Sequence, residues 1–418
     1  MEHTHYLIAG ASHAALAAMH TIRMADGEAT LSVVGPDDVL PYSPTVLPYV
    51  VSGRSDPERI FLRDEAYFAG IRAEYRRGRR LAKLDAGGKL AELDDGSAVK
   101  FEKLLLATGA RPAIPDVPGM EQVPYHVLRT LDDALRLRSG LSAGARHAIV
   151  LGAGLIGLHA AENMCRAGAR VTVIELQRQV LPGYFDGTAA AMIARAFDSA
   201  GVEIRTATRV TQAEPRASGF ALRLDDGECL AGDLLLISTG VTPVMDYLKG
   251  SPIARDRGIL VDTRMRTSAD GIWAAGDVAQ ASGFYDPTPV LNGILPSAVE
   301  QGRIAGMAMA GDPAVADYRG AVPLNTYGYF GRHAASVGSN TAPESAEVVV
   351  RSDAAAERYL KIILDGSRLH GIFAINTPID AGVMWELIRR RTDLAPVRDQ
   401  FLAQPRATAR LLMSRLWR

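Results

Sequence analysis

The strongest constraint on the fold is a pattern that occurs twice in the chain. In each copy an apolar run ends in a glycine turn, a helical stretch follows, and a second apolar run comes next. The first copy has runs at 6–9 and 31–34 around Gly10, with a helix over about 12–25. The second has runs at 148–151 and 171–174 around Gly152, with a helix that ends near 167. Strand–helix–strand alternation predicts an α/β protein with parallel sheets.

A second repeated motif follows each copy. Asp94-Asp95-Gly96 precedes an apolar run that ends in Thr108-Gly109, and Asp225-Asp226-Gly227 precedes one that ends in Thr239-Gly240. We therefore predict two Rossmann-like dinucleotide-binding modules, with residues 114–239 inserted in a module formed by 1–113 and 240–317. Residues 318–418 contain three strand patterns, a hairpin turn at Asp365-Gly366 and a helical tail from about Ala381, which predicts a separate C-terminal α+β domain.

Bulk properties exclude several classes of function. The 418 residues are 48% hydrophobic and 22% charged, with a net charge of -1, which is ordinary for a globular protein and gives no reason to expect nucleic acid or an anionic membrane as partner. No apolar stretch is long enough to span a membrane, and Met1 to His5 do not resemble a signal peptide. The two cysteines, Cys165 and Cys229, are far apart, so we expect a cytoplasmic protein without a disulfide or a protein-ligated metal site.

The motif Gly152-x-Gly154-x-x-Gly157 lies after a strand and before a helix, where a phosphate-binding turn belongs. Its glycines, together with Leu155 and Ile156 at the helix start, are candidate contacts of the dinucleotide phosphates. Glu175 ends the next strand and is the candidate partner of a ribose 2′-OH, which favours NADH over NADPH because a carboxylate repels a 2′-phosphate. Nearby Arg178 weakens that preference. The alternative is a glycine-rich turn in an unrelated α/β protein.

The N-terminal copy reads Gly10-x-Ser12-x-x-Ala15, with serine in place of the second glycine. Ser12 could donate a hydrogen bond to a pyrophosphate, and Asp37 or Asp38 is the candidate ribose acid. Taken alone, this copy fits a plain βαβ turn equally well. Further along, a strand ends in Gly276-Asp277, and an aspartate there either faces the ligand crevice or caps a helix.

The ordered set of motifs resembles the FAD-dependent pyridine nucleotide-disulfide oxidoreductase superfamily over nearly the whole chain. The closer branch contains ferredoxin and rubredoxin reductases, coenzyme A disulfide reductases and the flavin module of nitrite reductases. The motifs that carry the resemblance are Gly10–Ala15, Ala107–Pro112, Leu128–Ala134, Gly152–Gly157, Ser238–Pro243, Ala274–Asp277 and Ala298–Arg303.

The resemblance implies two bound cofactors, FAD on the outer module and NAD(H) on the inserted one. In that family Asp277 would hold the FAD ribitol chain, and a helix that begins near Pro296 would point at the flavin and stabilise a negative charge there. The implied FAD contacts are Gly10, Ser12, His13, Ala14, Asp37, Thr108, Gly109, Arg111, Gly276, Asp277, Pro296 and Ser297. The implied NAD(H) contacts are Gly152, Gly154, Leu155, Ile156, Gly157, Glu175 and Gly240.

Three positions depart from the family pattern. Thr45 stands where coenzyme A disulfide reductases have the redox cysteine, and threonine forms neither a thiolate nor a disulfide. Tyr49 or a neighbour stands where ferredoxin reductases have a lysine beside the flavin. His159 replaces the nicotinamide-side glutamate, and either contacts the nicotinamide carboxamide or packs against the sheet.

No side chain is therefore expected to act as a redox group, and the flavin carries the chemistry. Without a cysteine pair the chain needs an external partner, and we expect an iron–sulfur carrier or subunit. Flavoprotein subunits of NAD-linked 2-oxoacid dehydrogenases, such as phenylglyoxylate dehydrogenase, are similar in build. Two alternatives are a self-contained NADH oxidase or peroxide-reducing enzyme, and a redox-silent flavin-binding scaffold. A homo-oligomer is also compatible with the sequence.

The C-terminal tail is a candidate docking region for that partner. It is basic, with Arg389, Arg390, Arg391, Arg398, Arg406, Arg410, Arg415 and Arg418. It also carries the apolar residues Leu411, Leu412, Met413, Leu416 and Trp417. The alternative is that the tail packs on its own domain or on a second copy of the chain. We expect Cys165 to be a buried packing residue and Cys229 to lie on a strand.

Overall fold

The computed structural model describes the backbone of residues 2–416 and the side chains of the last helix as far as Ser414. The chain forms two compact units. The first comprises Met1–Val46, Ser55–Arg111 and Val241–Ala321, and the second comprises Leu47–Arg54, Pro112–Gly240 and Val322–Arg418. Both contain a parallel sheet with helices, so the predicted α/β class with two Rossmann-like modules is confirmed.

The first unit is built on a seven-stranded sheet in the order β3-β2-β1-β6-β5-β4, with β18 beside β6. Its strands are β1 (Glu2–Ala9), β2 (Leu31–Val34), β3 (Ala73–Arg76), β4 (Leu81–Asp85), β5 (Leu90–Leu93), β6 (Ala98–Leu106) and β18 (Ile272–Ala274). Strands β1, β2, β3, β6 and β18 are parallel, whereas β4 and β5 form an antiparallel extension. All four residues of β2 are buried, as expected of a central parallel strand.

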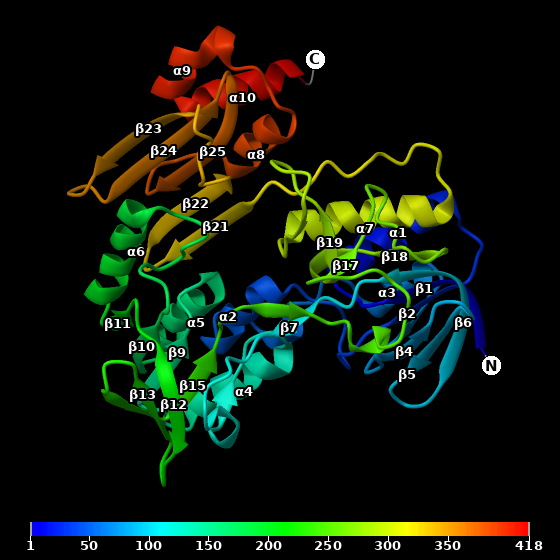
Figure 1. Cartoon of the computed structure of the whole chain (residues 1–418), viewed down its shortest axis with the longest axis horizontal. Coiled ribbons are helices and arrows are strands. Elements are labelled where there is room, and N and C mark those ends of the chain that lie inside the picture. The colour runs from blue at the N-terminus through cyan, green and yellow to red at the C-terminus, as the bar shows by residue number, and fades with distance from the viewer. Residues whose placement is uncertain (1, 417–418) are drawn as a thin grey trace. The chain divides into compact units, whose positions relative to one another are not determined.

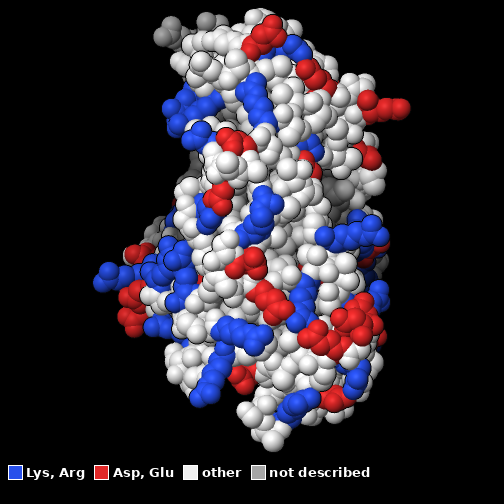
Figure 2. Space-filling model, turned by 90° about the vertical axis from the view of Figure 1, so that its left-hand side faces the viewer, with Lys and Arg blue, Asp and Glu red and all other residues white. Residues whose placement is uncertain are grey.

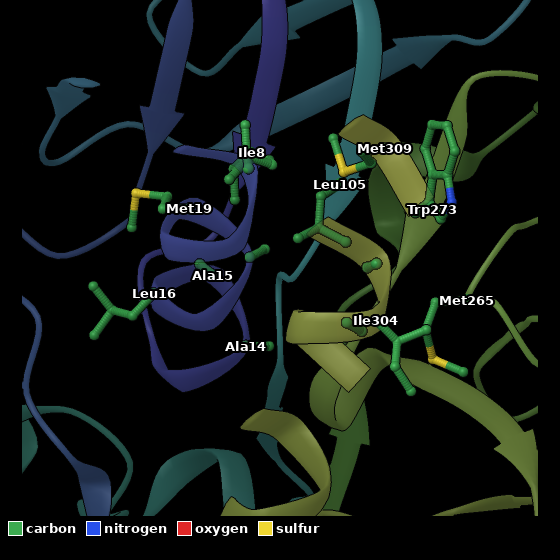
Figure 3. Packing of buried hydrophobic residues seen from close by; sticks show 14 of the residues in the cluster. Ile8, Ala14, Ala15, Leu16, Met19, Leu105, Met265, Trp273, Ile304 and Met309 are labelled. Carbon is green, nitrogen blue, oxygen red and sulfur yellow. The ribbon is translucent and has the colours of Figure 1, made fainter. Parts of the chain in front are cut away.

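Helices α1 (His13–Ala25) and α7 (Leu295–Ala310) lie side by side in this unit (Figure 1). A Cβ atom on Gly302 would lie 2.1 Å from the Ala14 carbonyl oxygen, so only glycine allows this close approach. Figure 3 shows the core that results, with Ile8 and Leu105 from the sheet, Met19 from α1, and Ile304 and Met309 from α7. This core fixes the start of α1 at the end of β1.

Smaller elements complete the first unit. They are the helix α3 (Glu65–Gly70) and the three-stranded sheet of β17 (Ile259–Leu260), β19 (Ala279–Ser282) and β20 (Pro289–Leu291). The short strands β7 (Ala110–Pro112) and β16 (Val241–Pro243) lie where the chain passes from one unit to the other.

The second unit contains the inserted module. Its parallel sheet has the order β11-β10-β9-β15-β8, with strands β8 (Tyr125–His126), β9 (His147–Leu151), β10 (Arg170–Ile174), β11 (Val202–Arg205) and β15 (Leu234–Ile237). Helices α4 (Leu131–Ser142), α5 (Leu155–Arg166) and α6 (Gly187–Ser199) belong to this module, as does an antiparallel sheet of β12 (Val210–Pro215), β13 (Phe220–Leu224) and β14 (Cys229–Gly232). The short helix α2 (Leu47–Val51) packs on α4 and α5.

The last hundred residues form the expected antiparallel sheet and helices. The sheet order is β21-β22-β25-β24-β23, with β21 (Leu324–Tyr329), β22 (Arg332–Gly338), β23 (Glu347–Asp353), β24 (Arg358–Asp365) and β25 (Arg368–Ile375). The predicted hairpin turn lies between β24 and β25, where Gly366 has a φ of +59°. Helices α8 (Ala381–Arg389), α9 (Arg398–Ala403) and α10 (Pro405–Leu416) follow.

The tail packs on neighbouring helices of the second unit rather than standing free. Thr408 and Ala409 of α10 are fully buried, and α10 packs on α8 and α9. Deleting the chain after Pro405 would therefore uncover core, so a truncation cannot separate docking from folding. Leu411 is 41% exposed, and Leu412 and Met413 are partly buried. Trp417, Arg418 and the side chains of Arg415 and Leu416 lie outside the described part of the chain.

The charges of the tail are largely paired within the domain. Glu386 accepts hydrogen bonds from both Arg389 and Arg390, and the Arg389 guanidinium lies 4.4 Å from the centre of the Trp385 ring. Arg398 pairs with Glu347. On the face drawn in Figure 2, acidic and basic side chains are interspersed, as the small net charge predicts. Among residues 2–416, no helix combines the length and the apolar character needed to cross a membrane.

Candidate functional site: two dinucleotide-binding turns

The turn between β1 and α1 has the geometry of a phosphate-binding loop. Gly10 has a φ of +120°, and a Cβ there would lie 2.0 Å from the Ala107 carbonyl oxygen. Ser12 is the N-cap residue of α1, yet its exposed hydroxyl makes no capping hydrogen bond. The first N–H groups of α1, from His13 and Ala14, therefore remain available for an anion at the helix N-terminus.

The side chain of His13 takes part in a hydrogen-bond network that the sequence did not reveal. Its Nε2 lies 3.0 Å from the Ser43 hydroxyl, and that hydroxyl lies 2.8 Å from the Thr45 hydroxyl. Burial lowers the pKa of the His13 imidazole, although the negative charge of Asp277 opposes the shift. A neutral imidazole thus begins a hydrogen-bonded chain that ends at exposed Thr45.

Two acidic residues lie at the ends of strands in the same sheet. Asp37 follows β2 and accepts a hydrogen bond of 2.8 Å from the Tyr42 hydroxyl, which fixes the carboxylate. Asp277 follows β18 within a single 3-10 turn whose N-cap is Ala275, so Asp277 is not itself the N-cap residue. A Cβ on Gly293 would lie 3.4 Å from its carboxylate, so glycine keeps the approach to Asp277 open.

The remaining FAD candidates lie on several elements of the first unit, and most of their side chains bond other residues. Gly276 has a φ of +80° and donates its N–H to the Gln301 side chain at 2.8 Å, a partner on α7 that the sequence motif contained but did not assign. Pro296 lies in the first turn of α7, and the Ser297 hydroxyl bonds Tyr318. The Thr108 hydroxyl donates to the Val244 carbonyl, Gly109 has a φ of +67°, and Arg111 pairs with Asp246.

The second turn, between β9 and α5, is closed more tightly. Gly152 has a φ of +103°, and a Cβ on Gly157 would lie 2.0 Å from the Gly152 carbonyl oxygen. Gly154 is the N-cap of α5, and a Cβ there would meet no described atom within 4 Å. The first and third glycines thus shape the turn, whereas the second leaves space at the helix N-terminus beside Leu155 and Ile156.

Glu175 is held rigidly beside this turn. Its two carboxylate oxygens accept hydrogen bonds from the Ala153 N–H at 2.7 Å and the Gln177 N–H at 2.8 Å. Each oxygen retains a lone pair for a ribose hydroxyl. Arg178 is exposed and makes no ion pair with the part of the chain that the structure describes. Gly240, directly before β16, has a φ of +117°, and a Cβ there would meet no described atom within 4 Å.

His159 lies one turn into α5 in an aromatic cluster. Its ring makes edge contacts with Tyr49, at 4.7 Å between centroids, and with Tyr327, at 5.8 Å. Burial lowers the pKa of the His159 imidazole, Glu162 opposes this shift, and Arg54 adds to it. The neutral ring can therefore donate or accept a hydrogen bond. Two positions that depart from the family pattern, Tyr49 and His159, are in direct contact.

Around this cluster, several buried polar atoms have no hydrogen-bond partner among the described residues. Strand β21 places Asn325, Tyr327 and Tyr329 on one face, and the amide nitrogen of the first and the hydroxyls of the other two are unpartnered. The Asn163 amide oxygen on α5 is a fourth such atom. An unsatisfied buried group costs about 1–3 kcal/mol, so a seam with four of them is suited to a polar ligand or ordered water. Sequence patterns gave no sign of this seam.

The two cysteines are free thiols that do not pair with each other. Cys165 is partly rather than fully buried, which corrects the expectation of a core residue, because its thiol reaches the Ala200 carbonyl at the end of α6. Burial raises the pKa of this thiol, so it stays protonated near neutral pH. Cys229 is the first residue of β14, as predicted, and is exposed. No group of three or more acidic, histidine or cysteine side chains that could hold a metal occurs within residues 2–416.

Replacing both Cys165 and Cys229 with serine should leave NADH-to-dye activity within about twofold of wild type, because neither thiol is activated or paired. Coenzyme A disulfide should not be reduced by either protein, since Thr45 cannot form a mixed disulfide. Steady-state assays with the dye and the disulfide measure both effects. Large activity loss in a serine variant that retains flavin would reveal a thiol function.

The two turns fit FAD and NAD(H). Each turn presents free N–H groups at a helix N-terminus and a glycine at a point where the backbone comes too close to its neighbour for a side chain. Each is also followed by an acidic residue after the next strand. The residues of the second turn also fit a nucleotide without a 2′-phosphate, because Glu175 presents a fixed carboxylate at the end of the strand that follows the turn.

Comparison with known proteins agrees with this assignment. Residues 4–305 match the family model of pyridine nucleotide-disulphide oxidoreductases. The chain is 59% identical to the NADH-dependent phenylglyoxylate dehydrogenase subunit epsilon of Aromatoleum evansii, over 100% of this chain and 99% of that protein. It is 26% identical to putidaredoxin reductase of Pseudomonas putida, over 95% of this chain and 93% of that one.

Solved structures show the same architecture. The ferredoxin reductase for the CYP199A2 system of Rhodopseudomonas palustris superposes with a TM-score of 0.82 at 27% identity, covering 89% of this chain and 91% of that chain. Putidaredoxin reductase, in its covalent complex with putidaredoxin, gives a TM-score of 0.83 at 26% identity, covering 93% of each chain. The predicted family, enzyme class and cofactors are thereby confirmed. The chain belongs to the pyridine nucleotide-disulphide oxidoreductase family, as an FAD-dependent oxidoreductase linked to NAD(H).

Proposed function

We propose that this protein is the NAD(H)-handling flavoprotein of a larger electron-transfer complex, and that it passes electrons between NAD(H) and an external iron–sulfur carrier or subunit. The observation that carries the proposal is a complete NAD(H) turn with Glu175 in a chain whose redox-cysteine position is Thr45. Such a chain can exchange electrons with NAD(H) but has no thiol pair to receive them. The subunit role named for the 59% identical relative fits this setting.

We assign FAD to residues 1–113 and 240–317, NAD(H) to 114–239, and an interface role to 318–418. The residues proposed to hold FAD are Gly10, Ser12, His13, Ala14, Asp37, Thr108, Gly109, Arg111, Gly276, Asp277, Pro296 and Ser297. Those proposed to hold NAD(H) are Gly152, Gly154, Leu155, Ile156, Gly157, Glu175 and Gly240. Bound FAD accepts a hydride and releases electrons one at a time, while the chain binds, orients and shields the reactants. The reducing cytoplasm suits two unpaired cysteines.

An anaerobic assay tests the proposal. The flavin-loaded protein is mixed with NADH and a 2Fe–2S ferredoxin, and ferredoxin reduction is followed in the absence of oxygen. We expect rapid reduction with about two ferredoxins per NADH, and little oxygen consumption when air replaces ferredoxin. Fast oxygen consumption would favour the NADH oxidase alternative, and an NADH-insensitive flavin absorbance would favour a redox-silent scaffold.

Replacing Asp277 with alanine should lower flavin occupancy several-fold, because the carboxylate stands at the end of β18 with an open approach past Gly293. Absorbance of the purified protein at 450 nm per polypeptide measures the loss, and added FAD should restore it only in part. Asp270→Ala, a change of an exposed acid in the loop before β18, is the matched control and should leave occupancy unchanged. Equal occupancy in both variants would remove Asp277 from the site.

His159 and Tyr327 are proposed to recognise the nicotinamide carboxamide. The rings of His159 and Tyr327 make an edge contact with 5.8 Å between centroids, and the Tyr327 hydroxyl has no partner among the described residues. His159 lies on α5, one turn after the glycine turn that we propose receives the pyrophosphate. His159→Leu and Tyr327→Phe should each weaken NAD⁺ binding by about tenfold, which is one lost hydrogen bond to a buried partner. ADP-ribose lacks the nicotinamide, so its Kd should not change. If His159 only packs against the sheet, calorimetry will show equal Kd changes for both ligands, or none.

A further inference from the structure

A groove in the C-terminal domain has no part in nucleotide binding as proposed above. It has a volume of about 440 Å³ and is lined by residues of β23 and β24, the loop after β25 and the first turns of α10. Three arginines line it, Arg351, Arg406 and Arg410. The rest of the wall contains apolar residues, among them Leu360 and Ala407, and the polar residues Thr377 and Gln404.

The groove carries an excess of positive charge. Arg406 and Arg410 both bond Asp380, the first with 3.1 Å between Nε and Oδ1, and their side chains remain 45% and 58% exposed. A guanidinium has five donors, so each keeps several N–H groups free after this contact. Arg351 is exposed and has no acidic partner in the described part of the chain. Three cations thus face a single carboxylate.

This excess is local. Elsewhere in the domain Arg332 pairs with Glu357, Arg390 with Glu386, and Arg398 with Glu347, which leaves little net field there. The face drawn in Figure 2 likewise shows acidic and basic side chains interspersed rather than a broad patch of one sign. The charge of the groove is therefore a specific feature and not a consequence of a basic surface.

The neighbouring strand favours a polypeptide as the occupant. β23 is the edge strand of its sheet, so one side of its backbone has no strand partner. Val348 and Val350 of this strand are 44% and 51% exposed. They lie on the opposite face of the strand from Arg351, so an extended peptide that reaches Arg351 would cover the unpaired backbone edge rather than these side chains, whereas a small free carboxylate would leave that edge unpaired.

We propose that the groove binds an acidic, extended segment of the electron-transfer partner, with its carboxylates on Arg351, Arg406 and Arg410 and an apolar side chain on Leu360 and Ala407. Arginine favours this role because its planar fork binds a carboxylate with two parallel hydrogen bonds. The inference rests on the proposed function, since it identifies where that partner docks. It also narrows the basic tail to two of its arginines, Arg406 and Arg410, which act together with Arg351 of β23.

Two variants test the groove by different means. Arg351→Glu reverses a charge without breaking an internal ion pair, and Ala407→Trp fills the groove while leaving its charges in place. Arg223→Glu, at an exposed position of β13 outside the groove, is the control for net charge. The probe is an acidic 2Fe–2S ferredoxin, titrated calorimetrically into the flavin-loaded protein at low and high salt. Melting temperature, flavin occupancy and NADH-to-dye activity verify that each variant is intact.

We expect Arg351→Glu and Ala407→Trp each to weaken ferredoxin binding by about tenfold or more, with a shallower salt dependence only in the charge variant, and Arg223→Glu to bind as wild type. Unchanged affinity in both groove variants, with ferredoxin still reduced by the wild-type protein, would overturn the groove but leave the proposed function standing. Failure of the wild-type protein to bind or reduce ferredoxin would overturn both.

Discussion

Replacing Gly154 with alanine is expected to remove most NADH-dependent flavin reduction while the protein remains folded and loaded with FAD. A Cβ at this position meets no described protein atom within 4 Å, so the substitution should not disturb the fold. The space it fills lies at the N-terminus of α5, where the pyrophosphate would approach the backbone in the proposed NAD(H) site. We expect the Kd for NADH to rise by about thirtyfold to a hundredfold, or roughly 2–3 kcal/mol of binding.

Anaerobic titration of flavin absorbance with NADH measures this effect. Gly183→Ala is the matched control, because Gly183 is exposed, and a Cβ there also meets no atom within 4 Å. It should behave as wild type. Gly157→Ala provides a contrast, since its Cβ would lie 2.0 Å from the Gly152 carbonyl and should lower stability as well as binding. A wild-type Kd for NADH in Gly154→Ala would mean that the nucleotide does not approach this turn.

NADH should reduce the flavin at least about tenfold more efficiently than NADPH. Glu175 cannot swing away from a 2′-phosphate, because two backbone N–H groups hold its carboxylate oxygens. The phosphate would lose a charged hydrogen bond to the carboxylate, worth about 1.5–3 kcal/mol, and gain like-charge repulsion. Stopped-flow reduction rates with both nucleotides give the ratio.

Glu175→Gln keeps the size of the side chain and removes its charge. It should lower the preference for NADH over NADPH, mainly by raising the efficiency with which NADPH reduces the flavin. Arg178→Ala removes a positive charge that could attract the 2′-phosphate, so it should raise the preference for NADH. Equal efficiency of the two nucleotides in the wild-type protein would mean that the exposed arginine outweighs the buried carboxylate.

Local sequence patterns were sufficient to predict the α/β fold class with its two Rossmann-like modules. Gly10, Gly152 and the Asp-Asp-Gly turns each require a backbone conformation that few residues adopt, so they mark turns without any knowledge of the fold. Apolar runs then predicted the parallel strands, since β9 and β10 bury every residue after the first and β1 buries its last four.

Contacts between distant segments could not be predicted in this way. The cluster of Tyr49, His159 and Tyr327 joins three elements that are far apart in sequence, and no periodicity links them. The same is true of the chain from His13 through Ser43 to Thr45, which depends on how the loop after β2 returns to α1. The basic tail is a further example, because its sequence left docking and packing as alternatives, whereas the ion pairs of Arg390, Arg398 and Arg406 with carboxylates depend on the folded chain.

The central claim is that NADH supplies electrons to one bound FAD that is the sole redox centre of this chain. Stepwise anaerobic addition of NADH to the purified, flavin-loaded protein tests it directly, with absorbance followed at 450 nm. The account predicts loss of the oxidised flavin absorbance with uptake of two electrons per FAD, and the same endpoint in the Cys165→Ser, Cys229→Ser protein. Flavin that stays oxidised in excess NADH would contradict the account, as would an uptake of four electrons that falls to two in the serine variant.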